Sequence, residues 1–172
     1  NLDTPVNLRQ GNDVQMNEFI DEVKGGKVAA VIIYGANPVY DHPRGAELAS
    51  SLPKVKLGIS FNDRADETAS LVQYICPAPH YLESWNDAEP MAGMYSLGQP
   101  TISLIFSTRQ AQASLLKWAG LPNDYHEYIK AYWRKNIFTQ GGTGNFENFW
   151  VQSLHDGVYQ AQQPVASSGT SF

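Results

Sequence analysis

The N-terminal half of the chain alternates between amphipathic segments and continuously apolar ones. In residues 12–26, apolar side chains recur at i, i+3, i+4 and i+7, which predicts a helix with one apolar stripe. Residues 28–34 are apolar without a break, which is typical of a strand in a sheet covered on both faces. The same alternation predicts further helices at 42–54 and 62–72 and further strands at 55–61 and 72–76. This order of elements, a strand, a helix, a strand, a helix and a strand, indicates a parallel βαβαβ sheet with right-handed crossovers.

The rest of the chain changes character. Residues 77–106 contain four prolines and little periodicity, so we expect an ordered loop there, with a further strand at 101–106. Helical periodicity returns in three later segments, 107–120, 123–136 and 145–157. We therefore expect an α/β fold: a Rossmann-like parallel sheet of three to five strands with flanking helices and a helical C-terminal part.

The domain organisation follows from the same pattern. We expect a single α/β domain over residues 1–159, followed by a flexible tail over 160–172, where no pattern is visible. Because the chain begins at Asn1 rather than at an initiator methionine, we interpret it as a mature product or as a fragment of a longer protein; the family resemblance described below implies the second, a fragment of a larger multi-domain protein.

Composition and charge narrow the classes of partner and cofactor. The net charge is −5 and the basic residues do not cluster, so nucleic acid is not expected as a partner. No apolar run approaches the roughly 20 residues of a membrane span. Cys76 is the only cysteine, which excludes an internal disulfide and an iron–sulfur ligand set within this chain. Its apolar surroundings before Pro77 favour a buried structural thiol over a nucleophile.

Two turns after predicted strands carry candidate site residues. The strand at 28–34 ends in a G-x-N-P turn, in which Gly35 permits a positive φ and Asn37 can satisfy local backbone groups. This turn could hold a diphosphate or a pterin, or it could be an ordinary strand-to-helix turn ending at Pro38. It is neither a Walker A loop nor G-x-G-x-x-G.

The second turn follows the strand at 55–61. It begins with Asn62 and Asp63 and continues with Asp66, Glu67 and Thr68. An acid at this position can hold a ribose or a guanine edge, as in dinucleotide-binding folds. Helix capping explains the same residues without a ligand.

Two further groups of residues could carry function. His80, Glu83, Asp87 and Glu89 lie within ten residues and could hold a metal or perform acid–base chemistry, but their spacing is not diagnostic and a hydrogen-bonded loop is the preferred interpretation. The helical segment 123–136 is rich in aromatic residues, more than one small sheet needs for its core. These aromatic side chains therefore suggest a face for a partner subunit or sister domain.

The ordered set of motifs resembles the molybdopterin oxidoreductase superfamily. In that family a strand ends in G-x-N-P, the next strand leads to an acid and an E-T-A helix, and a third ends in proline before a loop with a glutamate. The matching residues here are Gly35, Asn37, Pro38, Asp63, Glu67, Thr68, Ala69, Pro77 and Glu83. The sequence HYLESWNDAEP with QPTI is most similar to the molybdopterin-oxidoreductase-like iron–sulfur subunit of alternative complex III, a bacterial quinol:electron-acceptor oxidoreductase. The resemblance covers residues 27–120.

The resemblance implies a Rossmann-like domain whose loops after the strands contact a pterin–guanine dinucleotide in active relatives. That role carries over to Gly35, Asn37, Pro38, Asp63 and Thr68. It also implies that this chain alone binds no cofactor, that iron–sulfur clusters and any molybdopterin guanine dinucleotide belong to the full-length protein, and that the partners are other domains and respiratory-complex subunits. The expected location is the periplasmic side of a bacterial membrane, attached through a complex.

Three functional hypotheses follow from these observations. The first is a scaffold and docking domain of a respiratory oxidoreductase subunit, without complete catalytic machinery. The second is a true cofactor-binding domain of an active molybdenum or tungsten oxidoreductase of the polysulfide- or thiosulfate-reductase type. The third is a stand-alone α/β binding protein or hydrolase that uses His80 and Glu83.

Overall fold

A computed structural model describes residues 5–7 and 11–161, which form two compact units. Of the described residues, those within 10–83 and 102–123 form one unit, and those within 1–9, 84–101 and 124–172 form the other. The fold is mixed α/β, with a three-stranded parallel sheet, flanking helices, a small antiparallel sheet and a helical C-terminal part. The predicted fold class is thereby confirmed. Beyond Ala161, the tail predicted over 160–172 lies outside the described residues; Gln160 itself belongs to a strand.

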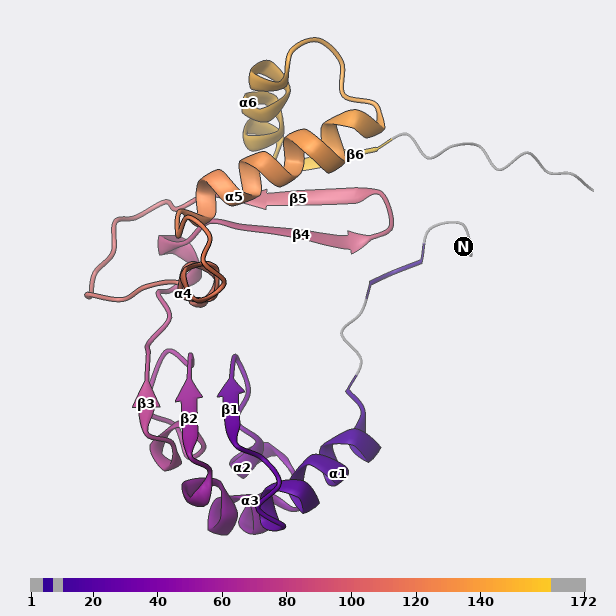
Figure 1. The fold of residues 1–172 in the computed structure, drawn as a ribbon. Coiled ribbons are helices and arrows are strands. Elements are labelled where there is room, and N and C mark those ends of the chain that lie inside the picture. Colours follow the sequence, from indigo (N-terminus) through magenta and orange to yellow (C-terminus); the bar gives the residue numbers. More distant parts are fainter. Residues whose placement is uncertain (1–4, 8–10, 162–172) are drawn as a thin grey trace, which may run out of the picture. The chain divides into compact units, whose positions relative to one another are not determined.

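The first unit is built on the predicted parallel sheet. Its strands are β1 (Ala30–Ile33), β2 (Leu57–Ser60) and β3 (Tyr74–Ile75), paired in that order and all parallel. Figure 1 shows the three strands side by side and pointing the same way. The helices of this unit are α1 (Asp13–Lys24), α2 (Pro38–Asp41), α3 (Gly45–Ser51) and α4 (Ala111–Trp118).

One face of this sheet packs on helices. Ile20 and Val23 of α1 and Leu48 of α3 form a buried cluster with Ile33 of β1. The other face of β1 is open: Ile32 is 51% exposed, although a strand covered on both faces was expected. A smaller cluster, in which Ala111 of α4 packs on Ile59 and Phe61, covers the carboxyl end of β2.

Local signals explain where α1 begins and ends. Asn12 accepts a hydrogen bond from the N–H of Gln15 through its side chain, which satisfies one of the free donors of the first turn. Gly25 caps the other end with its own N–H. Both boundaries agree with the sequence prediction.

The helix predicted at 62–72 is wrong. This segment holds only the 3₁₀ turn η2 (Ala69–Leu71). The N–H and hydroxyl of Thr68 bond to Asn37 of the turn after β1 instead of entering a longer helix. The Asp66 side chain accepts from the N–H of Ala69, at the start of η2, and from Asn62. The predicted strand at 101–106 is also wrong, since those residues form bends. Two short 3₁₀ turns, η1 (Leu52–Lys54) and η3 (Tyr81–Glu83), complete the unit.

The second unit contains an antiparallel sheet that the sequence pattern did not reveal. Its strands are β4 (Asn86–Met91), β5 (Met94–Gly98) and β6 (Val158–Gln160), in that order. The first two form a hairpin inside the segment expected to be a loop. Its irregular register between Ala88 and Met91, next to Pro90, explains why period-2 alternation is hard to see.

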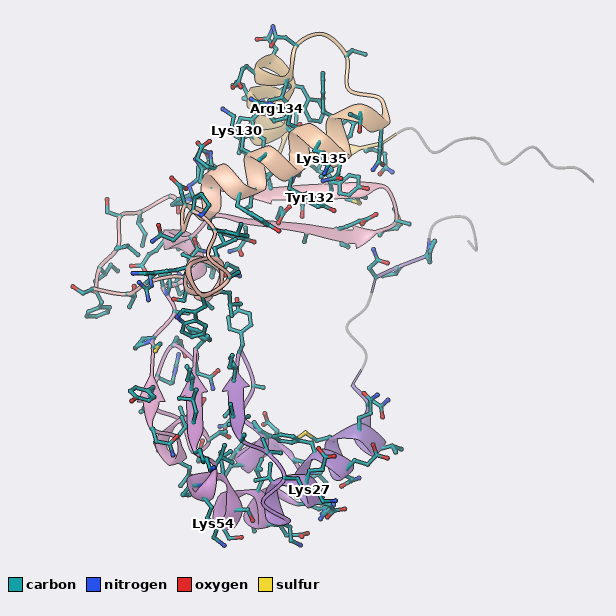
Figure 2. The ribbon with its side chains drawn as sticks, viewed as in Figure 1. Lys27, Lys54, Lys130, Tyr132, Arg134 and Lys135 are labelled. Atoms are coloured by element: carbon teal, nitrogen blue, oxygen red, sulfur yellow. The ribbon has the colours of Figure 1, made fainter. Side chains whose placement is uncertain are left out.

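Helices at the positions that the periodicity predicted pack on this sheet, which was not predicted. They are α5 (Tyr125–Tyr132), which continues through the π-helical turn η4 (Trp133–Ile137) and the 3₁₀ turn η5 (Phe138–Gln140), and α6 (Phe146–Asp156). Fully buried Trp133 lies at the centre of an aromatic core with Phe149 and Trp150. Figure 2 shows Lys130 and Arg134 near α6 and Tyr132 on the side of α5 that faces the strands.

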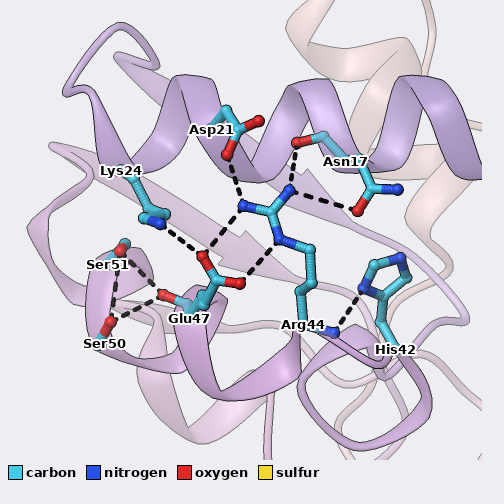
Figure 3. A network of polar contacts seen from close by, with 8 residues as sticks. All are labelled: Asn17, Asp21, Lys24, His42, Arg44, Glu47, Ser50 and Ser51. Carbon is cyan, nitrogen blue, oxygen red and sulfur yellow. Dashed lines mark hydrogen bonds and ion pairs between the residues drawn. The ribbon is translucent and has the colours of Figure 1, made fainter.

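An ion-pair network joins α1 to the start of α3 (Figure 3). The Arg44 guanidinium donates to carboxylates of Asp21 and Glu47, and Lys24 pairs with Glu47 as well. Hydrogen bonds from Arg44 and then from Lys24 lower the pKa of Glu47 from an ordinary 4.5 to about 2. The carboxylate therefore stays charged, and paired, far into acid.

This network should make the stability of the first unit depend on acidity. Because the folded-state pKa of Glu47 lies below its unfolded value, its contribution is complete above about pH 4.5 and is lost as the pH falls toward 2. We expect Glu47→Gln to lower the urea midpoint at pH 7 and to match the wild type near pH 2. A difference that stays constant between pH 7 and pH 2 would contradict the network's role.

A second prediction concerns close packing between α2 and α3. A Cβ added at Gly45 would lie 2.1 Å from the carbonyl oxygen of Val39, so the backbone must shift to admit it. We expect Gly45→Ala to destabilise the first unit by about 1–3 kcal/mol. The measurement is native-state hydrogen exchange of β1 and β2 amides. Gly11→Ala, where nothing lies within 4 Å, is the matched control and should change stability by less than about 0.5 kcal/mol.

Candidate functional site

The two candidate turns lie at the carboxyl edge of the parallel sheet, one after β1 and one after β2. Asn62, nearly buried, connects them. Its Oδ1 accepts from the N–H of Gly35 at 2.9 Å, and its Nδ2 donates to the carbonyl of Ala36 at 2.8 Å and to Asp66 at 2.6 Å. Asn62 therefore fixes the backbone of the first turn from the second.

Asn37 makes a second connection between the same turns. Its Oδ1 accepts from both the N–H and the hydroxyl of Thr68, at 3.1 and 2.6 Å, and its Nδ2 donates to Glu67 at 2.6 Å. The Thr68 hydroxyl in turn accepts from the N–H of Val39 at 3.0 Å. We call this set of hydrogen bonds among Asn37, Thr68 and Val39 the interlock. Because Thr68 is fully buried, its side chain has no contact with solvent. Asn37 of the G-x-N-P motif and Thr68 of the E-T-A motif are therefore hydrogen-bonded to each other.

Gly35 and Pro38 have backbone roles in the first turn. Gly35 has φ +60°, and an added Cβ would meet nothing within 4 Å, so conformation rather than space requires a glycine. Pro38 begins α2, where its fixed φ suits the first helical position and its missing N–H costs no hydrogen bond. Both residues shape the turn whether or not it holds a ligand.

The charges around the turns are mainly negative. Arg64 donates to Asp63 at 2.7 Å, and this hydrogen bond lowers the pKa of the exposed Asp63 carboxyl. The hydrogen bond from Asn37 likewise lowers the pKa of Glu67. Asp66 accepts from the N–H of Ala69 at 2.7 Å. The second turn is thus an acidic loop whose carboxylates are held by internal donors.

Two backbone donors and the arginine of these turns are already paired within the protein. A dinucleotide's phosphates need N–H groups or cations directed at them. Here the N–H groups of Gly35 and Thr68 both donate to asparagine side chains, and Arg64 is paired with Asp63. A contact of Gly35, Asn37, Pro38, Asp63 or Thr68 with the rings of a pterin or guanine stays a prediction.

The acidic and histidine residues between 80 and 89 are divided between the two units. Glu83 accepts from the N–H of His80 at 2.8 Å and from the N–H of Ile105 at 2.7 Å, which fixes the loop around η3. Asp87 and Glu89 belong to β4, in the other unit. Within the described parts of the chain, no three His, Cys, Asp or Glu side chains are placed to hold a metal ion.

Cys76 and His126, two further residue types that can carry chemistry, both pack against neighbouring side chains. Cys76 is partly buried and packs on the cluster of Ile59, Phe61 and Ala111. His126 stacks on Trp85, with ring centroids 4.1 Å apart. Sequence reasoning missed the bridging role of Asn62, which it treated as a helix cap; a polar residue directly after an apolar strand is the signal that could have revealed it.

Comparison with known proteins gives one distant relationship. No known family model matches the chain. The chain is 33% identical over 95 residues to the molybdopterin-binding-like subunit of a menaquinone reductase from Nitratidesulfovibrio vulgaris. The match covers 53% of this chain, and the chain spans 14% of that relative's length. This is a distant, partial homology. Of the helices in the described residues, none has the length and apolar character needed to cross a membrane.

The interlock between the turns can be tested at Thr68. Thr68→Val keeps the shape of the buried side chain but removes the hydroxyl, which leaves the Val39 N–H without its acceptor. We expect a loss of about 1–3 kcal/mol in unfolding free energy. Hydrogen exchange should report it as faster exchange at Val39. The exposed Thr143 offers a control: Thr143→Val should leave stability unchanged, and equal behaviour of the two variants would contradict the interlock.

Proposed function

We propose that this chain is a scaffold and docking domain of a molybdopterin-oxidoreductase-like subunit, in a respiratory quinone-linked complex of the alternative complex III type. The homology to a subunit of a menaquinone reductase supports the respiratory setting. The observation that carries the scaffold role is the pairing of Asn37 with Thr68, which turns both side chains toward the protein itself.

The hydrogen bonds of the interlock support a structural role for this domain rather than a role in cofactor binding. In a turn that cradles an anionic cofactor, backbone N–H groups face the ligand. Here the side-chain oxygens of Asn37 and Asn62 take that place and accept from Thr68 and Gly35. The sheet edge is thereby rigid without a ligand, which suits a surface that must present neighbouring loops to other domains.

The cofactors and partners follow from this proposal. With a single cysteine, this chain cannot supply the ligands of an iron–sulfur cluster, so clusters would be held elsewhere in the full-length protein. Its partners would be the other domains of the same polypeptide and the subunits of the complex. The complex would place it on the periplasmic side of the membrane, and electron transfer would run through other domains.

A second candidate is a working cofactor domain of an active molybdenum or tungsten oxidoreductase of the polysulfide- or thiosulfate-reductase type. Two observations favour it: the positive φ of Gly35 at a strand end, and the exposed Asp63 carboxylate, which could accept from a guanine edge. A hydrolase that uses His80 and Glu83 has no such support, because Glu83 accepts from two backbone N–H groups.

Metal and pterin analysis of the native protein distinguishes the two candidates. The protein that carries this chain should be purified with its partners from membranes and analysed by elemental mass spectrometry and by fluorescence of released, oxidised pterin. The scaffold proposal expects co-purification with other respiratory subunits and less than about a tenth of an equivalent of molybdenum, tungsten or pterin. Stoichiometric metal with pterin would overturn it in favour of the second candidate.

A matched pair of variants sharpens this experiment. Asp63→Asn removes the exposed carboxylate and should leave both assembly and pterin content unchanged if the domain is a scaffold. Asp13→Asn, at an exposed position in the first turn of α1, is the control for a surface charge change. Loss of pterin in Asp63→Asn but not in Asp13→Asn would assign the carboxylate to a working cofactor site.

A further inference from the structure

A cavity of about 300 Å³ lies within the second unit, between the β4–β5 hairpin and α5. Four tyrosines and two carboxylates line it: Tyr95, Tyr125, Tyr128, Tyr132, Asp87 and Glu89. Its size is at the lower end of the range for small-molecule sites. The cavity belongs to one compact unit and takes no part in the turns described above.

Helical spacing brings three of the rings to one side. Tyr125, Tyr128 and Tyr132 follow at i, i+3 and i+7 along α5. The rings of Tyr125 and Tyr128 stack with centroids 6.1 Å apart and planes 17° from parallel. Tyr128 and Tyr132 stay about half exposed, so the ring surface is open to a ligand. The sequence signal of surplus aromatics in this helix is therefore only partly explained by the core.

The carboxylates are held beside these rings by contacts with the core and the hairpin. Asp87 accepts from the indole N–H of fully buried Trp133 at 2.9 Å, and Glu89 accepts from the N–H of Gly93 at 2.8 Å. Burial raises the pKa of the Tyr95 phenol, and the charge of nearby Glu89 raises it further. Both Glu89 and Tyr95 line the cavity.

Two basic residues of α5 and η4, Lys130 and Arg134, are directed toward α6. Lys130 and Arg134 both pair with Glu147 of α6 at 2.8 Å, and Arg134 also lies over the ring of Phe146. Figure 2 shows Lys130 and Arg134 near α6, whereas Tyr132 lies toward the strands. Among the residues that the structure describes, no lysine or arginine lines the cavity, so the charged side chains of this lining are negative.

We propose that this cavity binds a small organic cation that carries a quaternary ammonium group. Aromatic rings attract cations through their quadrupoles, and rings with adjacent carboxylates are the chemistry that recognises quaternary ammonium ligands. A primary ammonium is more strongly hydrated and needs several hydrogen-bond acceptors in return for its water. A divalent metal ion would need more converging oxygen ligands than two carboxylates supply.

Calorimetric titration of the 172-residue chain tests the proposal. Choline chloride is the probe, and 3,3-dimethylbutan-1-ol, which has the same shape without the charge, is the neutral comparison at matched ionic strength. We expect saturable binding of choline and binding of the neutral alcohol at least tenfold weaker. No choline binding, or equal binding of the two compounds, would overturn the proposal, the second outcome indicating a merely apolar pocket.

Variants locate the binding in this cavity. Tyr132→Leu removes a ring and should weaken choline binding about tenfold, whereas Tyr132→Phe keeps the ring and should bind at least threefold more tightly than Tyr132→Leu. Glu89→Gln, which keeps an acceptor for Gly93, should weaken binding about threefold or more. Tyr40→Leu, at a highly exposed tyrosine of the other unit, is the control and should bind like the wild type. Wild-type affinity in Tyr132→Leu, with circular dichroism showing a folded protein, would overturn the site.

Discussion

The carboxyl edge of the parallel sheet depends on one interaction, the contact of the Asn37 side chain with Thr68. A single amide satisfies the N–H and hydroxyl of Thr68 and donates to Glu67, while the threonine hydroxyl anchors the start of α2 through Val39. Buried polar groups are costly unless they are paired, so each member of this set needs the others. The strand ends, the short helix after β1 and the acidic loop after β2 all take their positions from it.

That dependence also bears on function. A turn whose donors are already used by its own protein has no need of a ligand for its order, and the acidic side chains around it do not favour phosphate. The distant homology to a respiratory subunit and the hydrogen bonds that the turn makes within the protein support the same proposal, a domain with a structural role in a larger assembly. The tyrosine-lined cavity of the other unit differs from these turns, because its rings and carboxylates line a space that the protein leaves open.

Most of the elements could be predicted because their signals are local. The apolar stripe and the Asn12 cap of α1 act within a few residues, and the apolar strands with short connections determine a parallel sheet. The β4–β5 hairpin could not be predicted, since its irregular register and proline remove the alternation on which such a prediction depends. The helix expected at 62–72 failed for a different reason: the N–H and hydroxyl of Thr68 bond to Asn37, 31 positions earlier in the chain, instead of entering a helix.

By itself, the sequence determined the α/β class, the three parallel strands, the positions of Gly35 and Pro38 in a strand-to-helix turn, and the aromatic helices of the C-terminal part. These properties follow from periodicity and backbone preference, which act along the chain. Only the tertiary structure decided that Asn37 faces Thr68 across 31 positions in the sequence, and that Tyr132 shares a cavity with Glu89. Such pairings depend on which strand and helix ends meet in space, and no local pattern specifies that.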